Sequence, residues 1–427
     1  MDTLFSWANL HYKNVVYLKS GFFKSGFSGK YSILAFDLKE KRECGDINEI
    51  DNFINRNQAN ERFENFTFCL LPYESGDIFT SNVLYQTFNS KSNALTVRQK
   101  ILLYTFNQVI VYDNELGKVI YHKAPLVDIS TLGQQKNTFD VKIEKFSSNM
   151  TDDYYLYSVE KIINKIKNGD LLQVNFTRKY FSSGFVDNLD ILFLKLIFKS
   201  KSFYSAFFKD EDFILISSSP ERLFCKNNNT ITSNPIKGSV KISESSTKTK
   251  IEEELLNVKN RAENLMITDL IRNELSMISK AGDVKAELFK MDFYPHIAHL
   301  SSQVSCLIND EIKPSQILKA IFPPGSMTGA PKLAAIKVAL ELEASPRGFY
   351  SGSIGYFDYF KNGYSNVLNA DFSVIIRSII FRQLEGKNYY KIETQAGGGI
   401  THLSNPLLEL EELKAKLSMI FDVLKED

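Results

Sequence analysis

Short apolar runs separated by polar breaks dominate the first 145 or so residues. Three such runs, rich in β-branched and aromatic side chains, occupy residues 14–18, 31–36 and 108–112. Runs of this kind, bounded by polar residues, are typical of β-strands. A polar stretch at residues 133–137 follows them. We therefore expect a β-rich N-terminal lobe, residues 1–145, that is integrated with the core, and a second region at residues 146–427.

The hydrophobic pattern changes to helical spacing after residue 150. Thr151 is a candidate N-cap, and apolar residues recur every three or four positions until Gly169, where the helix is expected to end. Further helices are predicted at residues 251–275, 331–342 and 407–424, and strands at residues 213–216, 373–381 and 389–394. Helices and strands do not alternate strictly, so the pattern favours an α+β fold over a doubly wound parallel sheet.

The charge balance and the lack of long apolar runs argue against nucleic-acid binding and membrane insertion. The chain has 427 residues, 51 of them basic and 50 acidic, for a formal net charge of +1. This length suffices for a large core or two closely joined domains, and a near-neutral chain offers no field to hold nucleic acid. No signal-peptide pattern follows Met1 and no apolar run reaches membrane-spanning length. We expect a cytoplasmic protein that binds neither nucleic acid nor membrane.

The cysteines are too far apart for a zinc site or a redox dithiol. They are Cys44, Cys69, Cys225 and Cys306. Four cysteines in a chain of this length do not make a disulfide scaffold either, so buried thiols are expected. The 33 Phe and 20 Tyr residues indicate well-filled sheet faces.

A lysine in a short polar loop is the first candidate for chemistry. Lys237 lies in residues 234–239, and Glu221 precedes it by sixteen residues, after the strand-like run at 213–216. By default, Lys and Glu are solvated surface residues. A lysine amine that is held unprotonated can act as a nucleophile, and a buried carboxyl can act as a general acid.

Two glutamates on the predicted C-terminal helix are candidates for a cation site. Glu409 and Glu412 are three residues apart, which places both carboxylates on one face of that helix. Such a pair can hold a hard cation. With Glu411 between them, a solvated acidic face is the alternative.

Several separate motifs in residues 148–427 resemble the chorismate-utilising enzymes. They are the segments at residues 169–175, 234–239, 261–270, 298–302, 322–332, 352–356 and 396–400. The Pro-Ile-Lys-Gly sequence around Lys237 is similar to one branch of that family, component I of the aminodeoxychorismate synthases. The resemblance implies two large, mainly antiparallel sheets packed together with helices outside, and a chorismate-binding catalytic region at residues 146–427.

The resemblance also implies a set of substrate-binding residues. Arg377 would bind one carboxylate of chorismate with Tyr356 as hydroxyl partner, and Gly397, Gly398 and Gly399 would bring backbone amides to the second. A triple glycine is otherwise a turn or bulge. Four further positions match residues near the substrate, and otherwise have structural roles in a strand, the core or a helix cap: Gln173, His299, Ser326 and Thr328.

A magnesium site follows from the same resemblance. Glu263 and Glu412 would bind Mg²⁺, which bridges them to the ring carboxylate, with Glu409 acting through water. The family usually has an acid at the position of Asn260, and an amide there contributes no charge. We therefore expect weaker binding of the metal than with a fourth carboxylate.

The reaction implied by the resemblance is amination of chorismate at C4. Lys237 would attack C2 while Glu221 protonates the departing C4 hydroxyl, and ammonia would then enter at C4 and expel the lysine. The product, 4-amino-4-deoxychorismate, is a precursor of 4-aminobenzoate and folate. None of the four cysteines lies in a Gly-rich elbow, so a separate glutamine amidotransferase is expected to supply ammonia.

Three other activities are weighed against this one. Anthranilate synthase component I shares nearly every site residue, but usually has Ala at the position of Lys237. Isochorismate and salicylate synthases place a lysine at the position of Gln173 to activate water, which a glutamine cannot do. A catalytically silent chorismate-binding regulatory subunit is the third. The N-terminal segments at residues 17–20 and 29–32 match a tryptophan pocket of related proteins too weakly to decide whether a regulator binds.

Overall fold

The computed structural model describes residues 1–20, 29–79, 100–123, 139–211, 213–242, 247–294, 297–384 and 388–425. The boundary predicted at residues 133–137 lies outside them. The strands are β1 (Asn14–Ser20), β2 (Tyr31–Cys44), β3 (Phe66–Leu71), β4 (Ile101–Asp113), β5 (Lys118–Lys123), β6 (Val141–Ile143), β7 (Ser147–Ser148), β8 (Gln173–Val186), β9 (Tyr204–Asp210), β10 (Phe213–Ser219), β11 (Arg222–Asn227), β12 (Thr230–Ser233), β13 (Ile236–Lys241), β14 (Lys285–Phe293), β15 (Ile297–Leu307), β16 (Gly329–Ala330), β17 (Ser353–Asn362), β18 (Ser365–Val374), β19 (Ser378–Gln383) and β20 (Tyr389–Ile400). The helices are α1 (Asp2–His11), α2 (Ile47–Arg56), η1 (Tyr73–Ile78), α4 (Asp152–Lys167), α5 (Leu189–Ser200), α6 (Lys248–Leu255), α7 (Val258–Ser276), α8 (Pro314–Ile321), α9 (Gly325–Thr328), α10 (Lys332–Leu342) and α11 (Pro406–Val423).

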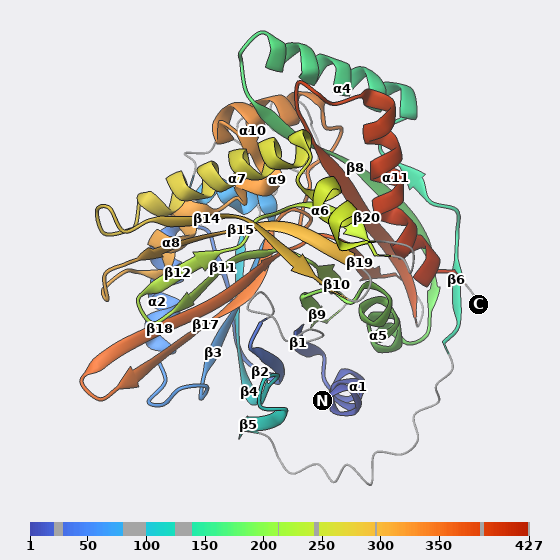
Figure 1. Ribbon diagram of the computed structural model, residues 1–427. Helices are drawn as coiled ribbons and strands as arrows, with labels where there is room; N and C mark the ends of the chain where they lie inside the picture. Colours follow the sequence, from blue (N-terminus) through green and yellow to red (C-terminus); the bar gives the residue numbers. More distant parts are fainter. Residues whose placement is uncertain are drawn as a thin grey trace.

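The strands form two antiparallel arms that share β4. In the first arm β4 pairs with β2, and the order continues through β1, β9, β10, β19 and β20 to β8. In the second arm β4 pairs with β3, and the order continues through β17, β18, β11 and β12 to β15, which also pairs with β13 and β14. N-terminal strands therefore contribute to both arms (Figure 1).

Three apolar clusters make up most of the core. One lies between the arms and contains side chains of both, among them Phe68, Phe208 and Ile354. A second packs the first arm against α1, α4, α5, α10 and α11, and a third packs the second arm against α2, α7 and α8. The predicted α+β fold, two packed antiparallel sheets with helices outside, is confirmed, and the structure adds that the sheets are continuous through β4.

The predicted first helix is confirmed as α4. Its N-cap is Thr151, whose hydroxyl accepts a hydrogen bond from the Tyr154 N–H at 3.1 Å, and Gly169 follows its end with φ +85°. The prediction of a single helix at residues 251–275 is wrong. One helix, α6, ends at Leu255, and a second, α7, begins at Val258. The Asn257 side chain accepts a hydrogen bond from the Asn260 N–H at 2.8 Å, which satisfies a backbone donor at the new N-terminus.

The strand predicted at residues 373–381 is also divided. β18 belongs to the second arm and β19 to the first, and residues 375–377 cross between them, with Arg377 at φ +49°. A second crossing joins β10 of the first arm to β11 of the second at residues 220–221. Backbone bonds tie the crossings together, because Val374 N–H donates to Glu221 C=O and Ser218 N–H donates to Arg377 C=O, both at 3.1 Å.

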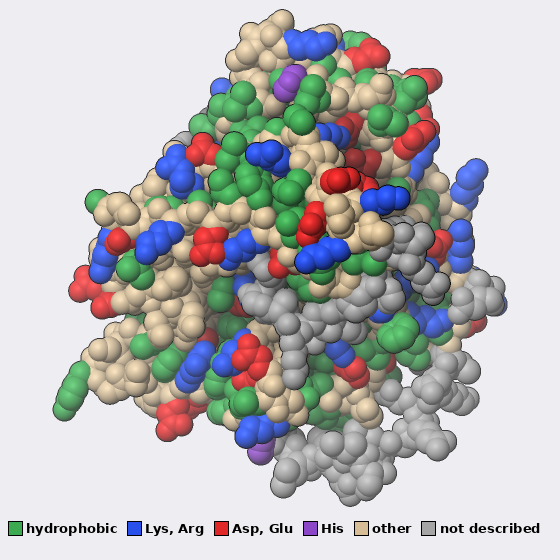
Figure 2. Space-filling model, viewed as in Figure 1, with side chains coloured by type: hydrophobic (Ala, Val, Ile, Leu, Met, Phe, Trp, Pro, Cys, Tyr) green, Lys and Arg blue, Asp and Glu red, His purple; other side chains and the backbone are tan. Residues whose placement is uncertain are grey.

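The surface agrees with the composition. Acidic and basic side chains are interspersed over the face shown in Figure 2, as expected of a near-neutral chain. Cys44, Cys69 and Cys306 are buried, Cys225 is half-buried, and all four are free thiols. No described helix combines the length and the hydrophobicity that a membrane crossing requires.

A buried arginine joins four segments of the fold. Arg347 is 2% exposed. Its guanidinium donates to Met327 C=O at 2.6 Å, to Asn175 C=O at 2.7 Å and to both carboxylate oxygens of Glu343, and its backbone N–H donates to Glu74. The five residues come from the turn after α10, α9, β8 and η1, so one guanidinium fixes these elements relative to each other.

Arg347→Met is expected to lower the free energy of unfolding by about 3–5 kcal/mol, because it leaves the buried Glu343 carboxylate without its partner. Urea unfolding followed by circular dichroism measures the loss. The matched control is Arg272→Met, whose Asp269 partner is 65% exposed; it should cost less than about 1 kcal/mol. Equal small losses in both variants would contradict the assigned role of Arg347.

Candidate functional site

A cavity of about 490 Å³ lies beside the two crossings between the arms. Most of the site residues predicted from the sequence line it. They are Glu221, Lys237, Glu263, Ser326, Arg377, Gly397, Gly399, Glu409 and Glu412. The crossings place Glu221 and Arg377 at its wall, β13 supplies Lys237, and α7 and α11 supply the other carboxylates.

Glu221 and Lys237 act on each other electrostatically across this cavity. Burial raises the pKa of the Glu221 carboxyl, while a hydrogen bond from Ser326 and the charge of Lys237 oppose that shift. No described residue pairs with the Lys237 amine. The cavity therefore brings together a carboxyl with a raised pKa and an amine with no hydrogen bond or ion pair in the described chain.

The Arg377 guanidinium is the natural binding group for an anion. Burial lowers its pKa, and no described charge partner offsets that effect. A buried guanidinium without a carboxylate partner is stabilised by an anionic ligand, and its fork matches a carboxylate. The Arg377 charge also reaches His299, where burial first and Arg377 second lower the pKa to about 4.

The three glycines belong to strand β20 and not to a turn. Gly397 and Gly399 pair with Thr177 and Asn175 of β8. A Cβ on Gly397 would lie 2.6 Å from Phe176 C=O, and one on Gly399 would lie 2.3 Å from Gln173 Nε2, so a side chain at either position would clash. Gly398 faces the other way, toward Glu409 on α11.

Three predicted substrate-binding residues lie behind the lining. Gln173 is fully buried beneath Gly399, and neither atom of its amide has a hydrogen-bond partner in the described chain. His299 Nδ1 shares a 2.7 Å hydrogen bond with Ser239 Oγ. Thr328 Oγ1 donates to Pro324 C=O within α9 at 2.8 Å, which is a local structural role.

Tyr356 is placed elsewhere, and a different tyrosine reaches the cavity. Tyr356 lies in β17 and packs edge-on against Phe66, with ring centroids 5.0 Å apart, in the cluster between the arms. Tyr350, which precedes β17, lines the cavity with its hydroxyl toward the Gly397 backbone amide. Tyr350, and not Tyr356, therefore lines the cavity that Arg377 also lines. The sequence signal available was its position two residues before the Gly-Ser-Ile-Gly-Tyr motif.

Charged pairs surround the three carboxylates of the predicted metal site. Lys259 Nζ lies 3.9 Å from Glu263 Oε1 and 3.7 Å from Glu409 Oε1, and Lys416 Nζ lies 2.8 Å from Glu412 Oε1. Burial alone would raise the pKa of Glu412, but Lys416, Lys259 and Lys237 together hold it below its usual range. Burial raises the pKa of Glu409.

The donor set fits a hard cation, although no ready cluster is assembled. Glu263 Oε1 is buried without a hydrogen-bond partner in the described chain, and carboxylate oxygens are what Mg²⁺ binds. Within the described ranges, no three His, Cys, Asp or Glu side chains converge closely enough to hold a metal as they stand. Asn260 also lines the cavity, but its amide donates to Glu254 C=O at 3.1 Å and so links α7 to α6.

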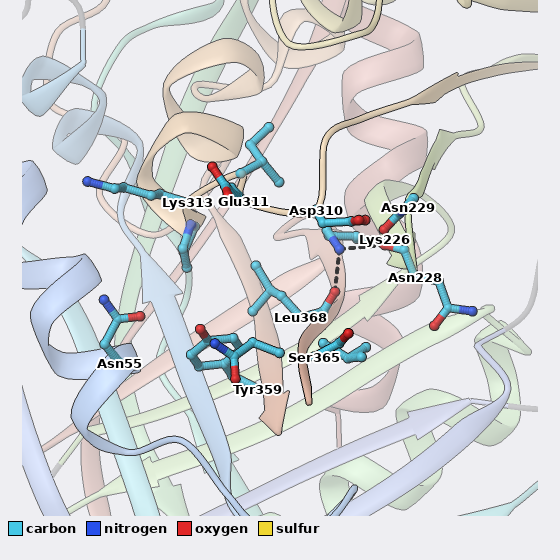
Figure 3. Close-up of a pocket in the computed structure, with 14 residues that line it drawn as sticks. Asn55, Lys226, Asn228, Asn229, Asp310, Glu311, Lys313, Tyr359, Ser365 and Leu368 are labelled. Carbon is cyan, nitrogen blue, oxygen red and sulfur yellow. Dashed lines mark hydrogen bonds between the residues drawn. The ribbon is translucent and has the colours of Figure 1, made fainter. Parts of the chain in front are cut away.

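A second cavity, of about 560 Å³, contains none of the predicted site residues. Figure 3 shows Lys226, its most buried charged group, with dashed lines from the amine to neighbouring oxygen atoms. The Lys226 amine donates to Asn228 C=O and Leu368 C=O, and burial lowers its pKa to about 8. These bonds hold β11 against β18, so the lysine has a structural role.

Comparison with known proteins agrees with the geometry. The family model for chorismate binding enzymes matches residues 17–422. The chain belongs to this family. This chorismate-binding enzyme is 32% identical over 382 residues to anthranilate synthase component 1 of Lactococcus lactis, covering 83% of the chain and 80% of the relative.

Other relatives have a different activity in their names. The enzyme is 34% identical over 284 residues to aminodeoxychorismate synthase component 1 of Escherichia coli, covering 66% of the chain and 60% of the relative. Among solved structures, anthranilate synthase component I of Streptococcus pneumoniae superposes with a TM-score of 0.72 at 21% identity, covering 93% of each chain, which shows the shared fold. Identity alone thus does not separate the two activities.

Glu221→Gln tests the burial of this carboxyl through the pH dependence of stability. Because the folded pKa is raised above the ordinary 4.5, the folded protein binds more protons than the unfolded chain above that pH, and stability falls as pH rises. Glu221→Gln lacks this loss, so its stability relative to the wild type, measured by urea unfolding, should increase as the pH is raised above the ordinary 4.5. A difference that stays constant or decreases over this range would show that the pKa is not raised.

Proposed function

We propose that this chorismate-binding enzyme is an aminodeoxychorismate synthase component, which converts chorismate and ammonia to 4-amino-4-deoxychorismate for 4-aminobenzoate and folate biosynthesis in the cytoplasm. The observation that carries the proposal is the position of Lys237. Its amine lines the same cavity as Glu221 and has no partner among the described residues. A nucleophile at this point distinguishes amination at C4 from the anthranilate reaction, which needs none.

The substrate is held by its two carboxylates. Arg377 supplies a fork-shaped cation for one of them, with the Tyr350 hydroxyl beside it. The segment of β20 that contains Gly397 and Gly399 lines the same cavity and would present backbone amides to the second carboxylate. These contacts fix the chorismate ring between Lys237 and Glu221.

The first half of the reaction replaces the C4 hydroxyl by a bond at C2. The neutral Lys237 amine attacks C2, the two ring double bonds shift, and the C4–O bond breaks. Glu221 gives its proton to the departing oxygen, which leaves as water, and the Lys237 nitrogen then gives up a proton that restores the acid form of Glu221. The raised pKa of Glu221 supports this role, because a carboxyl with a higher pKa keeps its proton to a higher pH.

The second half of the reaction moves the ring double bonds back to their original positions. Ammonia forms a bond to C4, the double bonds return, and the C2–N bond to Lys237 breaks. The proton that the nitrogen at C4 loses balances the one that the lysine nitrogen regains. The sum is chorismate plus ammonia giving 4-amino-4-deoxychorismate plus water, and both catalytic side chains return to their starting state.

We further propose that Glu263, Glu412 and, through water, Glu409 hold Mg²⁺. When bound, the ion neutralises the ring carboxylate and helps to position it. Glu263 and Glu409 lie on the helices α7 and α11, which approach the cavity from different directions, so oxygen donors are available on two sides. The buried, unpartnered Glu263 Oε1 supports this assignment.

The ammonia is proposed to come from a glutamine amidotransferase partner. The relatives named component 1 support a second component, and none of the four free cysteines lines the cavity.

Lys237→Ala should fold normally and still bind chorismate, because Arg377 and the β20 glycines hold the carboxylates. Formation of 4-amino-4-deoxychorismate from chorismate, ammonium and Mg²⁺ should fall at least about a hundredfold, since losing a covalent step costs several kcal/mol of barrier. Product analysis by mass spectrometry measures this, with Lys337→Ala on the exposed face of α10 as control. Wild-type-like amination by Lys237→Ala would refute the covalent role, and anthranilate from the wild type would refute the choice of activity.

The nitrogen source gives a separate prediction. The purified chain alone should use ammonium salts and not glutamine, and its rate should rise with pH while ammonium deprotonates. Addition of a glutamine amidotransferase component should make glutamine effective. Glutamine-driven turnover by the rigorously purified chain would contradict the proposal that the amide is cleaved by a partner.

A further inference from the structure

Lys259 occupies an unusual position at the carboxylates of the cavity. It lies in the first turn of α7, and its ammonium is 3.9 Å from Glu263 of the same helix and 3.7 Å from Glu409 of α11. The two carboxylates belong to different helices, and this one cation is paired with both. It stands between them, where a divalent ion shared by the same two carboxylates would have to bind.

The charges around Lys259 explain why a cation is needed there. Glu263 is 17% exposed and Glu409 only 4%, so both carboxylates are largely removed from solvent. Lys416 is engaged elsewhere, because its amine donates to Gly397 C=O and pairs with Glu412. Asn260 is neutral and donates to Glu254 C=O. Among the described residues, Lys259 is therefore the cation that forms ion pairs with both carboxylates.

The Lys259 side chain is also able to move away from the two carboxylates into solvent. Its side chain is 46% exposed, and a lysine has a flexible stem and a strongly hydrated ammonium that is stable in water. Both of its ion pairs are longer than hydrogen-bonding distance. Departure of this side chain would expose Glu263 Oε1, which has no hydrogen-bond partner in the described chain.

We propose that Lys259 is the internal counter-ion of the metal site: it holds Glu263 and Glu409 together in the metal-free enzyme and competes with Mg²⁺ for them. This inference rests on the proposed magnesium site. A divalent ion binds by displacing the ammonium, which swings to solvent. Occupancy of the site is therefore set by a competition between a lysine of the chain and the free cation.

Removing the Lys259 ammonium should strengthen the binding of Mg²⁺. Each ion pair of a half-exposed lysine contributes modestly, so Lys259→Met should lower the apparent Kd for Mg²⁺ by about three- to tenfold. Lys259→Arg keeps the charge and should stay within about twofold of the wild type. Isothermal titration calorimetry of the full chain with MgCl₂ alone, without chorismate, measures both values independently of turnover.

Glu263→Gln tests the proposed magnesium site separately from the proposed competition by Lys259. If Glu263→Gln loses Mg²⁺ binding and Lys259→Met binds more tightly than the wild type, both are supported. If Glu263→Gln loses binding but Lys259→Met binds like the wild type or more weakly, the competition is refuted while the magnesium site stands. If Glu263→Gln binds Mg²⁺ like the wild type, or if neither the wild type nor Lys259→Met binds it, the magnesium site and the competition are both refuted.

A thermal measurement gives a second readout. Without metal, Lys259→Met leaves Glu263 and Glu409 without their shared cation, so its Tm should lie below that of Lys259→Arg. Saturating Mg²⁺ should then raise the Tm of Lys259→Met more than that of Lys259→Arg, because tighter binding to the folded state stabilises it further. Equal increases in the two variants would overturn the inference.

Discussion

The buried Arg347 guanidinium is the constraint on which the geometry of the cavity depends. It donates to the carbonyls of Asn175 and Met327, and both residues line the cavity from different elements. Its partner Glu343 in turn accepts from the Thr177 hydroxyl, which accepts from the Gln395 amide on β20. One buried charge therefore sets the distance between β8, β20 and α9, and so the width of the substrate site.

Two residues of the proposed site lie where the chain passes from one arm of the sheet to the other. Glu221 and Arg377 are at two such crossings, tied together by backbone hydrogen bonds between Val374 and Glu221 and between Ser218 and Arg377. A residue at a crossing is outside the regular ladders, so its side chain can face the cavity between elements. The proposed acid and the proposed anion-binding group are thereby fixed relative to each other by main-chain contacts.

The sequence was most informative where function and local pattern coincide. Helix α4 could be predicted because Thr151, the apolar spacing and Gly169 are local signals, and the carboxylates on α7 and α11 are brought to one cavity as expected. The crossing at Arg377 could not be predicted, because a change of sheet depends on tertiary partners, whereas the break at Asn257 was missed although its capping contact with the Asn260 N–H is local. Tyr356 was predicted in place of Tyr350. The alternation of side chains along β17 directs Tyr356 into the apolar cluster between the arms, and this could not be seen from the motif alone. Lys259 gave no signal, since its role depends on Glu409, 150 positions further along the chain.

The central claim is that Lys237 forms a bond to the substrate, and the mass of the protein tests it most directly. Incubation of the full chain with chorismate and Mg²⁺ in the absence of ammonia stops the proposed reaction after its first half. The account predicts a protein heavier by one chorismate less one water, with the added mass on the peptide that contains Lys237 and absent from Lys237→Ala. Rapid formation of 4-amino-4-deoxychorismate when ammonia is present, with no adduct on Lys237 when it is withheld, would contradict the account.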